Sequence, residues 1–185
     1  MIVSEFPDKA IRLAKKFWPG PLTLVLPKKD IISDEITSGL ETVAVRIPGH
    51  PMLKSLLELV GKPLAAPSAN PFGYISPTTA EHVLDQLGDK ISMILDGGPA
   101  TVGLESTIVK VESEKLTVLR AGGIAIEELK AFDQNLEIRT SSSTPSAPGM
   151  LETHYSPKKK LYYLNDITPG KLNLHKTGLI CFCEF

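Results

Sequence analysis

The chain has 185 residues, 20 lysines and arginines against 21 aspartates and glutamates, and a hydrophobic fraction of 42%. This balance is typical of a globular protein and excludes a collagen-like, disordered or nucleic-acid-coating chain. No apolar run approaches the roughly 18 residues of a membrane span, and the first residues lack the pattern of a secretory signal. The only cysteines, Cys181 and Cys183, lie one residue apart. We therefore expect a reducing cytoplasm, with no disulfide and no zinc site.

Helices and strands alternate in the first half of the chain. The predicted elements are helix 7–18, strand 22–26, strand 42–47, helix 51–60 and the short apolar strand 64–67. Gly61 is expected to end the second helix. In the strand 42–47 (TVAVRI), strict alternation places Val43, Val45 and Ile47 on the core face, opposite Thr42, Ala44 and Arg46.

The second half continues with a helix at 78–87, a buried strand at 91–95, a hairpin formed by 107–111 and 116–119, and a helix at 124–132. The first of these helices has two candidate starts, Ser76 followed by Pro77, or Thr78 in a capping box with Glu81. Residues 140–149 are rich in Ser, Thr and Pro and read as a linker. Two strand-like segments follow at 160–164 and 178–185. The last one reaches the end of the chain, so the chain is expected to be incomplete.

Polar residues at strand ends are the candidates for chemistry. Arg46 offers the planar guanidinium group that binds carboxylates and phosphates, although this segment alone favours a solvated strand face. Ser68 and Asn70 share a face with Ala66 in an extended, proline-stiffened stretch, for which an ordinary polar turn is the alternative. Ser106 and Arg120 lie at the base of the predicted hairpin, where they could meet.

Other motifs are weaker. The turn Asp96-Gly-Gly follows an apolar segment, but the sequence contains neither a G-x-G-x-x-G fingerprint nor a P-loop lysine motif. The four histidines, His50, His82, His154 and His175, show no metal-ligand spacing, and His82 is expected on an exposed helix face. These patterns alone indicate only an α/β domain with polar patches at strand ends.

An ordered set of motifs is more specific. The segments are 16–25 (KFWPGPLTLV), 43–48 (VAVRIP), 50–51 (HP), 67–70 (PSAN), 76–78 (SPT), 96–98 (DGG), 105–109 (ESTIV), 118–122 (VLRAG), 148–150 (PGM) and 154–157 (HYSP). Together they resemble the YrdC/Sua5 family, the threonylcarbamoyl-AMP synthases, in its longer two-domain Sua5 form. The resemblance extends over about residues 4–185.

The resemblance implies an α/β fold: a twisted, mixed open sheet with flanking helices, followed by a linker and the start of a small Rossmann-like domain. The implied domains are a partial catalytic domain at 1–140, a linker crossing the active site at 141–157, and a truncated C-terminal domain at 158–185. Family members also have an N-terminal Thr-Glu-Thr-x-Tyr-Gly-Leu turn and a Lys-x-Arg motif, which this sequence does not contain. We therefore expect the chain alone to be inactive or nearly so, and its sheet to have an unpaired edge.

The implied reaction joins L-threonine, bicarbonate and ATP into threonylcarbamoyl-AMP and releases pyrophosphate. Its product is used in the threonylcarbamoyladenosine modification of tRNA. The resemblance therefore implies the tRNA-modification machinery, and possible RNA binding, as partners. Mg²⁺ is expected with the triphosphate, without a visible set of protein ligands.

The resemblance also implies roles for individual residues. The expected ATP contacts are Thr42, Ser68, Ser76, Arg120 and His154; the expected threonine contacts are Arg46, Ala66 and Ser106; and the expected catalytic pair is Ser68 and Asn70. Two alternatives remain: the carbamoyl-adenylate-forming domain of a hydrogenase-maturation protein, and a non-catalytic RNA- or nucleotide-binding module. Acylphosphatase or zinc-finger regions would indicate the first, and strongly salt-dependent RNA binding without ATP binding would indicate the second.

Overall fold

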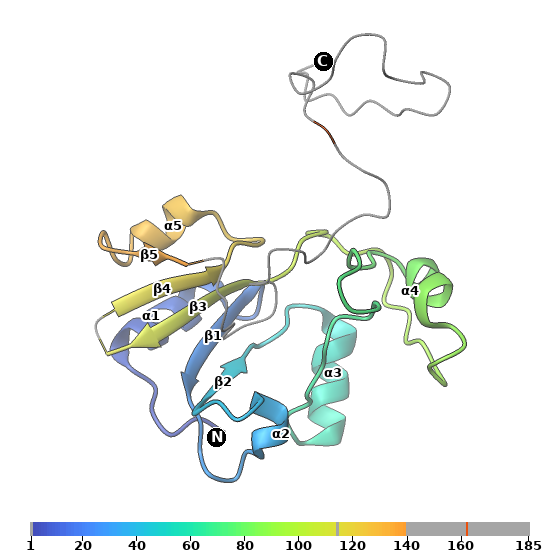
Figure 1. Ribbon diagram of the computed structural model, residues 1–185, viewed down its shortest axis with the longest axis horizontal. Helices are drawn as coiled ribbons and strands as arrows, with labels where there is room; N and C mark the ends of the chain where they lie inside the picture. The colour runs from blue at the N-terminus through green and yellow to red at the C-terminus, as the bar shows by residue number, and fades with distance from the viewer. Residues whose placement is uncertain (1, 114, 140–161, 163–185) are drawn as a thin grey trace.

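The computed structural model describes residues 2–113, 115–139 and 162. Five strands form one sheet in the order β2-β1-β3-β4-β5, shown in Figure 1. Their bounds are β1 Leu22–Pro27, β2 Thr42–Val45, β3 Thr107–Glu112, β4 Lys115–Arg120 and β5 Glu137–Ile138. β1 pairs with β3, and β4 with β5, in parallel; the β1–β2 and β3–β4 pairs are antiparallel. The expected mixed α/β sheet is confirmed.

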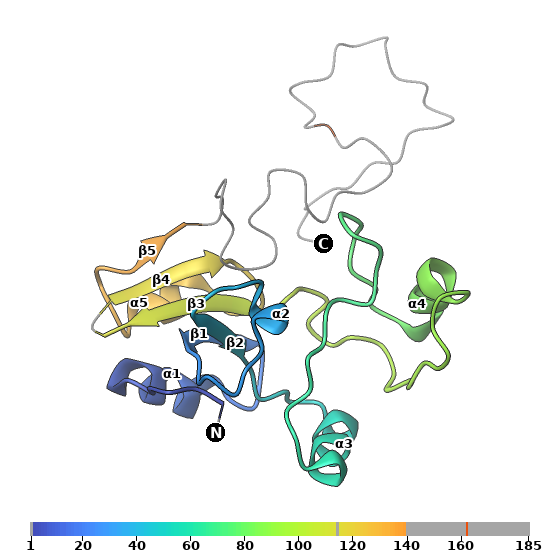
Figure 2. The same cartoon turned by 60° about the horizontal axis from the view of Figure 1, so that its bottom comes forward.

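Five helices accompany the sheet in this part of the chain: α1 Asp8–Phe17, α2 Asp34–Thr37, α3 Pro51–Val60, α4 Ala80–Leu87 and α5 Ile126–Lys130. α1 and α5 cover one face of the sheet, whereas α3 and α4 lie beyond its edge in both views (Figures 1 and 2). Among the described residues, no helix combines the length and hydropathy that crossing a membrane requires.

The main core lies between the sheet and the two helices on its face. Leu13 of α1 and Leu129 of α5 are fully buried against alternating side chains of the central strands, such as Leu24 and Val109. This alternation is the pattern of a half-buried strand, in which every second residue faces the helices. A smaller cluster of Val25, Ile108 and Leu119 is buried separately from this core.

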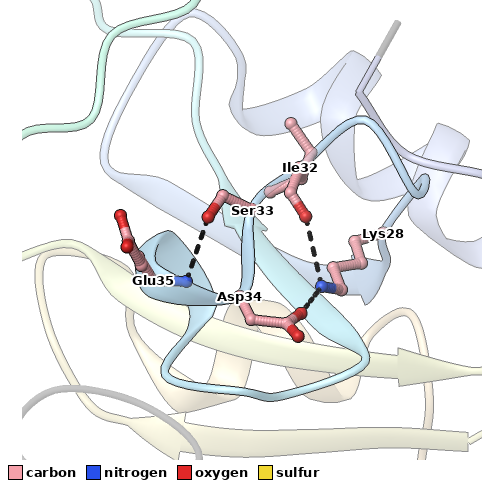
Figure 3. Close-up of polar contacts among 5 residues, drawn as sticks. All are labelled: Lys28, Ile32, Ser33, Asp34 and Glu35. Carbon is pink, nitrogen blue, oxygen red and sulfur yellow. Dashed lines mark hydrogen bonds and ion pairs between the residues drawn. The ribbon is translucent and has the colours of Figure 1, made fainter.

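Local hydrogen bonds and an ion pair stabilise the long connection between β1 and β2 (Figure 3). Lys28 Nζ donates to the carbonyl oxygen of Ile32 at 3.2 Å and also forms an ion pair with Asp34. The Ser33 hydroxyl accepts from the backbone N–H of Glu35 at 3.3 Å and caps α2. Neither α2 nor β5 was predicted, because each is too short to show a hydrophobic period.

Two predicted strands are wrong. Residues 64–67 and 91–95 belong to no strand of the sheet. Met93 is 80% exposed and Leu95 58% exposed, so the second segment is not buried either. An apolar run predicts burial, but a strand also needs a partner backbone, and no described strand pairs with these segments.

Other boundaries differ by a few residues. β2 ends at Val45, so Ile47 is outside it and 46% exposed, whereas Val43 is buried as expected. α4 begins at Ala80 after Thr79, whose hydroxyl accepts from the backbone N–H of His82. Neither predicted start of this helix is therefore correct. α3 ends at Gly61, which adopts the expected left-handed conformation with φ 62°.

Candidate functional site

The sheet topology gathers polar residues at one end of the sheet. β1 and β3 run parallel to each other, and β2 and β4 run antiparallel to them. The first residues of β1 and β3 therefore lie beside the last residues of β2 and β4. Thr23 and Arg120 lie in these strand ends, and Arg46 and Ser106 directly adjoin β2 and β3. We call these four residues the sheet-end cluster.

Arg120 and Ser106 are in direct contact, as the predicted hairpin indicated. Arg120 Nη2 donates to the Ser106 hydroxyl at 3.1 Å, and both Nε and Nη2 donate to the Ser106 carbonyl oxygen at 3.1 and 3.0 Å. Ser106 is 8% exposed. The guanidinium and the hydroxyl are thus held together at the base of the β3–β4 hairpin.

Arg46 brings a second guanidinium to the same end of the sheet. Its Nε donates to the carbonyl oxygen of Gly20 at 2.9 Å, and the N–H of Gly20 donates to Ile47 at 2.9 Å. Burial, and then the positive charge of Arg120, lower the pKa of Arg46. Arginine remains protonated at neutral pH all the same. Arg46 is nevertheless an exposed residue, and two neighbouring cations attract an anion.

Gly122 allows the close approach at the hairpin base. A Cβ at this position would lie 2.3 Å from the Glu105 carbonyl oxygen and 2.7 Å from the Ser106 carbonyl carbon. The neighbouring Gly123 N–H donates to the Glu105 oxygen at 3.0 Å. A residue with a side chain at 122 would push the two strand ends apart, so the Arg120–Ser106 contact depends on this glycine.

A second polar region lies around α4. Ser68, Ser76 and Asp96 line a cavity of ≈330 Å³, and Asp96 also lines an adjoining one of ≈450 Å³ beside Glu81. The Ser76 hydroxyl is buried without a hydrogen-bond partner among the described residues. The structure thus places Ser68 and Ser76, two of the expected nucleotide contacts, on one cavity.

A histidine connects this region to β2. The His50 Nε2 atom lies 3.1 Å from the carbonyl oxygen of Gly97, in the turn that follows the apolar segment 91–95. A Cβ on Gly97 would lie 2.8 Å from the His50 ring. Sequence reasoning assigned no role to His50. The HP motif at the start of α3 was the available signal for it.

Asn70 is engaged in its own turn. Its Nδ2 donates to the carbonyl oxygens of Tyr74 at 2.9 Å and Pro71 at 3.1 Å, while its Oδ1 is buried without a partner among the described residues. The amide therefore leaves one buried acceptor without a hydrogen bond among the described residues.

The remaining expected site residues are dispersed. Thr42 pairs with Pro27 at the start of β2, at the opposite end of that strand from Arg46. Ala66 lies in an exposed, irregular stretch. His154 is outside the described residues. Within the described part of the chain, no group of three or more His, Cys, Asp or Glu residues could hold a metal ion.

Comparison with known families gives two matches. Residues 1–122 match the Sua5/YciO/YrdC model, described as "Telomere recombination". Residues 124–182 match the model of the threonylcarbamoyl-AMP synthase C-terminal domain.

Two curated relatives with similar sequences are named threonylcarbamoyl-AMP synthase. The threonylcarbamoyl-AMP synthase of Pyrococcus abyssi is 43% identical over 166 residues, which cover 87% of this chain and 49% of that protein. The Bacillus subtilis enzyme of the same name is 46% identical over 160 residues, covering 84% of this chain and 46% of the relative. The chain thus spans about half the length of these relatives.

Solved structures have the same fold. The crystal structure of P. abyssi Sua5 complexed with L-threonine matches with a TM-score of 0.80 and 45% identity, over 84% of this chain and 47% of that one. Escherichia coli YciO matches with a TM-score of 0.60 and 24% identity, over 68% of this chain and 61% of that one, which supports the fold alone.

Proposed function

This chain belongs to the Sua5/YciO/YrdC family, as its motifs indicated, and from this membership we propose that it forms part of an L-threonylcarbamoyladenylate synthase. The proposed reaction converts L-threonine, bicarbonate and ATP into threonylcarbamoyl-AMP and pyrophosphate. The observation that carries the proposal is the sheet-end cluster, in which two guanidinium groups and a hydroxyl converge in a chain 43% identical to a synthase of that name.

The cluster suits the chemistry of this reaction. A threonine carbamate is an anion, and it must approach the α-phosphate of a second anion. Such an encounter needs cations and oriented donors that neutralise both partners. Holding the two partners in line provides much of the rate.

We assign the threonine side of the site to Arg46, Ser106 and Ala66. The guanidinium of Arg46 would bind the carboxylate, and the Ser106 hydroxyl would donate a hydrogen bond to it. The proximity of both side chains to Arg120 supports this assignment for the two polar residues. For Ala66, only the motif supports it.

We assign the nucleotide side to Thr42, Ser68, Ser76, Arg120 and His154, with Ser68 and Asn70 as the catalytic pair. The cavity that Ser68 and Ser76 share supports their part, and so does the unpartnered hydroxyl of Ser76. For Thr42 and His154 the support is the motif alone. ATP would enter as its Mg²⁺ complex, with the metal held mainly by phosphates and water.

The proposal extends to the cellular setting. The product would pass to the tRNA-modification machinery in the cytoplasm. Acidic and basic residues nearly balance over the chain. We therefore expect any binding of double-stranded RNA to be weak and to disappear as the salt concentration rises.

The proposal is tested by titrating the 185-residue chain with L-threonine in a calorimeter, with D-threonine and L-alanine as controls. Saturable binding that prefers L-threonine supports it, and equal binding of all three amino acids contradicts it. Pyrophosphate release is measured in parallel with L-threonine or bicarbonate left out in turn. We expect little release from this chain alone, because the Lys-x-Arg motif is absent from its sequence.

A further inference from the structure

Thr23 is buried inside the sheet-end cluster, where no function has been assigned to it. It lies on β1, is 9% exposed, and places its Oγ1 2.7 Å from the Oγ of Ser106, which is 83 residues away in the sequence. A buried hydroxyl needs a hydrogen-bond partner, and the partner of Thr23 is the hydroxyl of a proposed ligand-binding residue. We propose that Thr23 is a positioning residue that makes the Ser106 hydroxyl a hydrogen-bond donor to the carboxylate of the substrate, an inference that rests on the proposed function.

The argument begins with the hydrogen-bonding capacity of the Ser106 hydroxyl. A serine hydroxyl has one hydrogen and two lone pairs. A guanidinium can only donate, so the 3.1 Å contact from Arg120 Nη2 occupies one lone pair of Ser106. The hydrogen and the other lone pair remain for Thr23 and for a ligand.

Two arrangements of the Thr23–Ser106 contact are then available. In one, Ser106 donates to Thr23 and has no hydrogen left for a ligand. In the other, Thr23 donates to Ser106, fills its second lone pair and leaves the Ser106 hydrogen free. A carboxylate only accepts hydrogen bonds, so Ser106 can contribute to its binding in the second arrangement alone.

The charges around the pair favour an anionic ligand. Arg120 contacts Ser106 directly, and it lies close enough to Arg46 to lower the pKa of that residue. A donating Ser106 beside Arg120 adds a charge-assisted hydrogen bond to an anion, the stronger kind of hydrogen bond. The ligand class is thus a small carboxylate, although a phosphate oxygen has the same acceptor chemistry.

The test compares three variants of the 185-residue chain. Thr23→Val keeps the shape and removes the hydroxyl, whereas Thr23→Ser keeps the hydroxyl. Thr117→Val is the matched control, because Thr117 is also a buried strand threonine, 5% exposed, on β4. Each variant is titrated by calorimetry with L-threonine, with L-threoninamide, which lacks the carboxylate, and with pyrophosphate. Thermal unfolding shows that each variant is folded.

We expect Thr23→Val to weaken L-threonine binding about tenfold, the usual effect of losing one hydrogen bond to a charged group. Binding of L-threoninamide should change less than about twofold, and Thr23→Ser should restore most of the affinity for L-threonine. Thr117→Val should bind L-threonine as the unmutated chain does.

Three results would overturn the inference. Unchanged L-threonine binding in Thr23→Val removes the role, and equal losses for L-threonine and L-threoninamide reduce Thr23 to a packing residue. A loss confined to pyrophosphate assigns the Ser106 hydrogen to a phosphate instead of a carboxylate. If the unmutated chain binds pyrophosphate but no L-threonine, the proposed threonine site fails. The carboxylate role of Thr23 fails with it, and weaker pyrophosphate binding in Thr23→Val would then assign the Ser106 hydrogen to a phosphate.

Discussion

Lys9 and Asp133 form an ion pair between α1 and the segment that follows α5. Lys9 Nζ lies 3.0 Å from Asp133 Oδ2, so the first helix is tied to the segment just after α5. The Asp133 carboxylate also accepts from the backbone N–H of Asn135 at 3.0 Å. Both hydrogen bonds lower the pKa of Asp133, and the one from Lys9 has the larger effect.

The first prediction concerns acid stability. A carboxyl whose pKa is lower in the folded state binds fewer protons there than in the unfolded chain. Its stabilisation is complete above its unfolded pKa of about 4 and is lost as the pH falls through the folded value. Urea unfolding at several pH values should therefore show Asp133→Asn less stable than the unmutated chain at neutral pH, and the gap should close below about pH 4. A gap independent of pH would contradict the assignment.

The second prediction concerns Arg46. Replacing Arg46 by alanine should weaken L-threonine binding more than ATP binding, because the guanidinium faces the proposed carboxylate position. The L-threonine affinity of Arg46→Lys should lie between those of the unmutated chain and Arg46→Ala, since lysine keeps the charge but lacks the planar guanidinium group. Parallel titrations of L-threonine and ATP measure both affinities. A larger loss for ATP would reject the threonine role of Arg46.

The third prediction concerns Gly122. The Gly122→Ala variant should destabilise the fold by about 1–3 kcal/mol, the usual cost of forcing atoms into a packed space. It should also weaken L-threonine binding, because the added Cβ would lie 2.3 Å from the Glu105 oxygen at the hairpin base. Gly39→Ala is the control: this glycine has φ 78° and open space around it. Its substitution should lower stability through backbone strain and leave L-threonine binding unchanged.

The fourth prediction concerns the core. Leu24 on the central strand β1 is fully buried, so Leu24→Ala should lower the free energy of unfolding by about 2–5 kcal/mol. Ile31→Ala, in the long connection after β1, should change it by less than about 0.5 kcal/mol, because Ile31 is 75% exposed. Urea unfolding of both variants measures the difference. Equal effects would mean that Leu24 does not pack in the core.

The sequence predicted local relationships better than distant ones. The hairpin pattern brought Ser106 and Arg120 together correctly, because hairpin strands are neighbours by construction. The contact between Thr23 and Ser106 depends instead on the parallel β1–β3 pairing, and no local pattern specifies which strands become neighbours. The same limit explains why residues 64–67 and 91–95 were expected as strands: their composition was suitable, but partner strands cannot be identified from composition.

The pairing of β1 with β3 also has a consequence for synthesis on the ribosome. Leu22 aligns with Thr107, and Val25 with Lys110, so the centre of the sheet joins segments made far apart in time. During translation β1 can pair with β2 early. The backbone groups on the other edge of this apolar strand have no strand to pair with until β3 has been synthesised. Such long-range pairing slows folding and exposes strand edges meanwhile. A nascent chain halted before residue 107 should therefore be the species that most needs a chaperone.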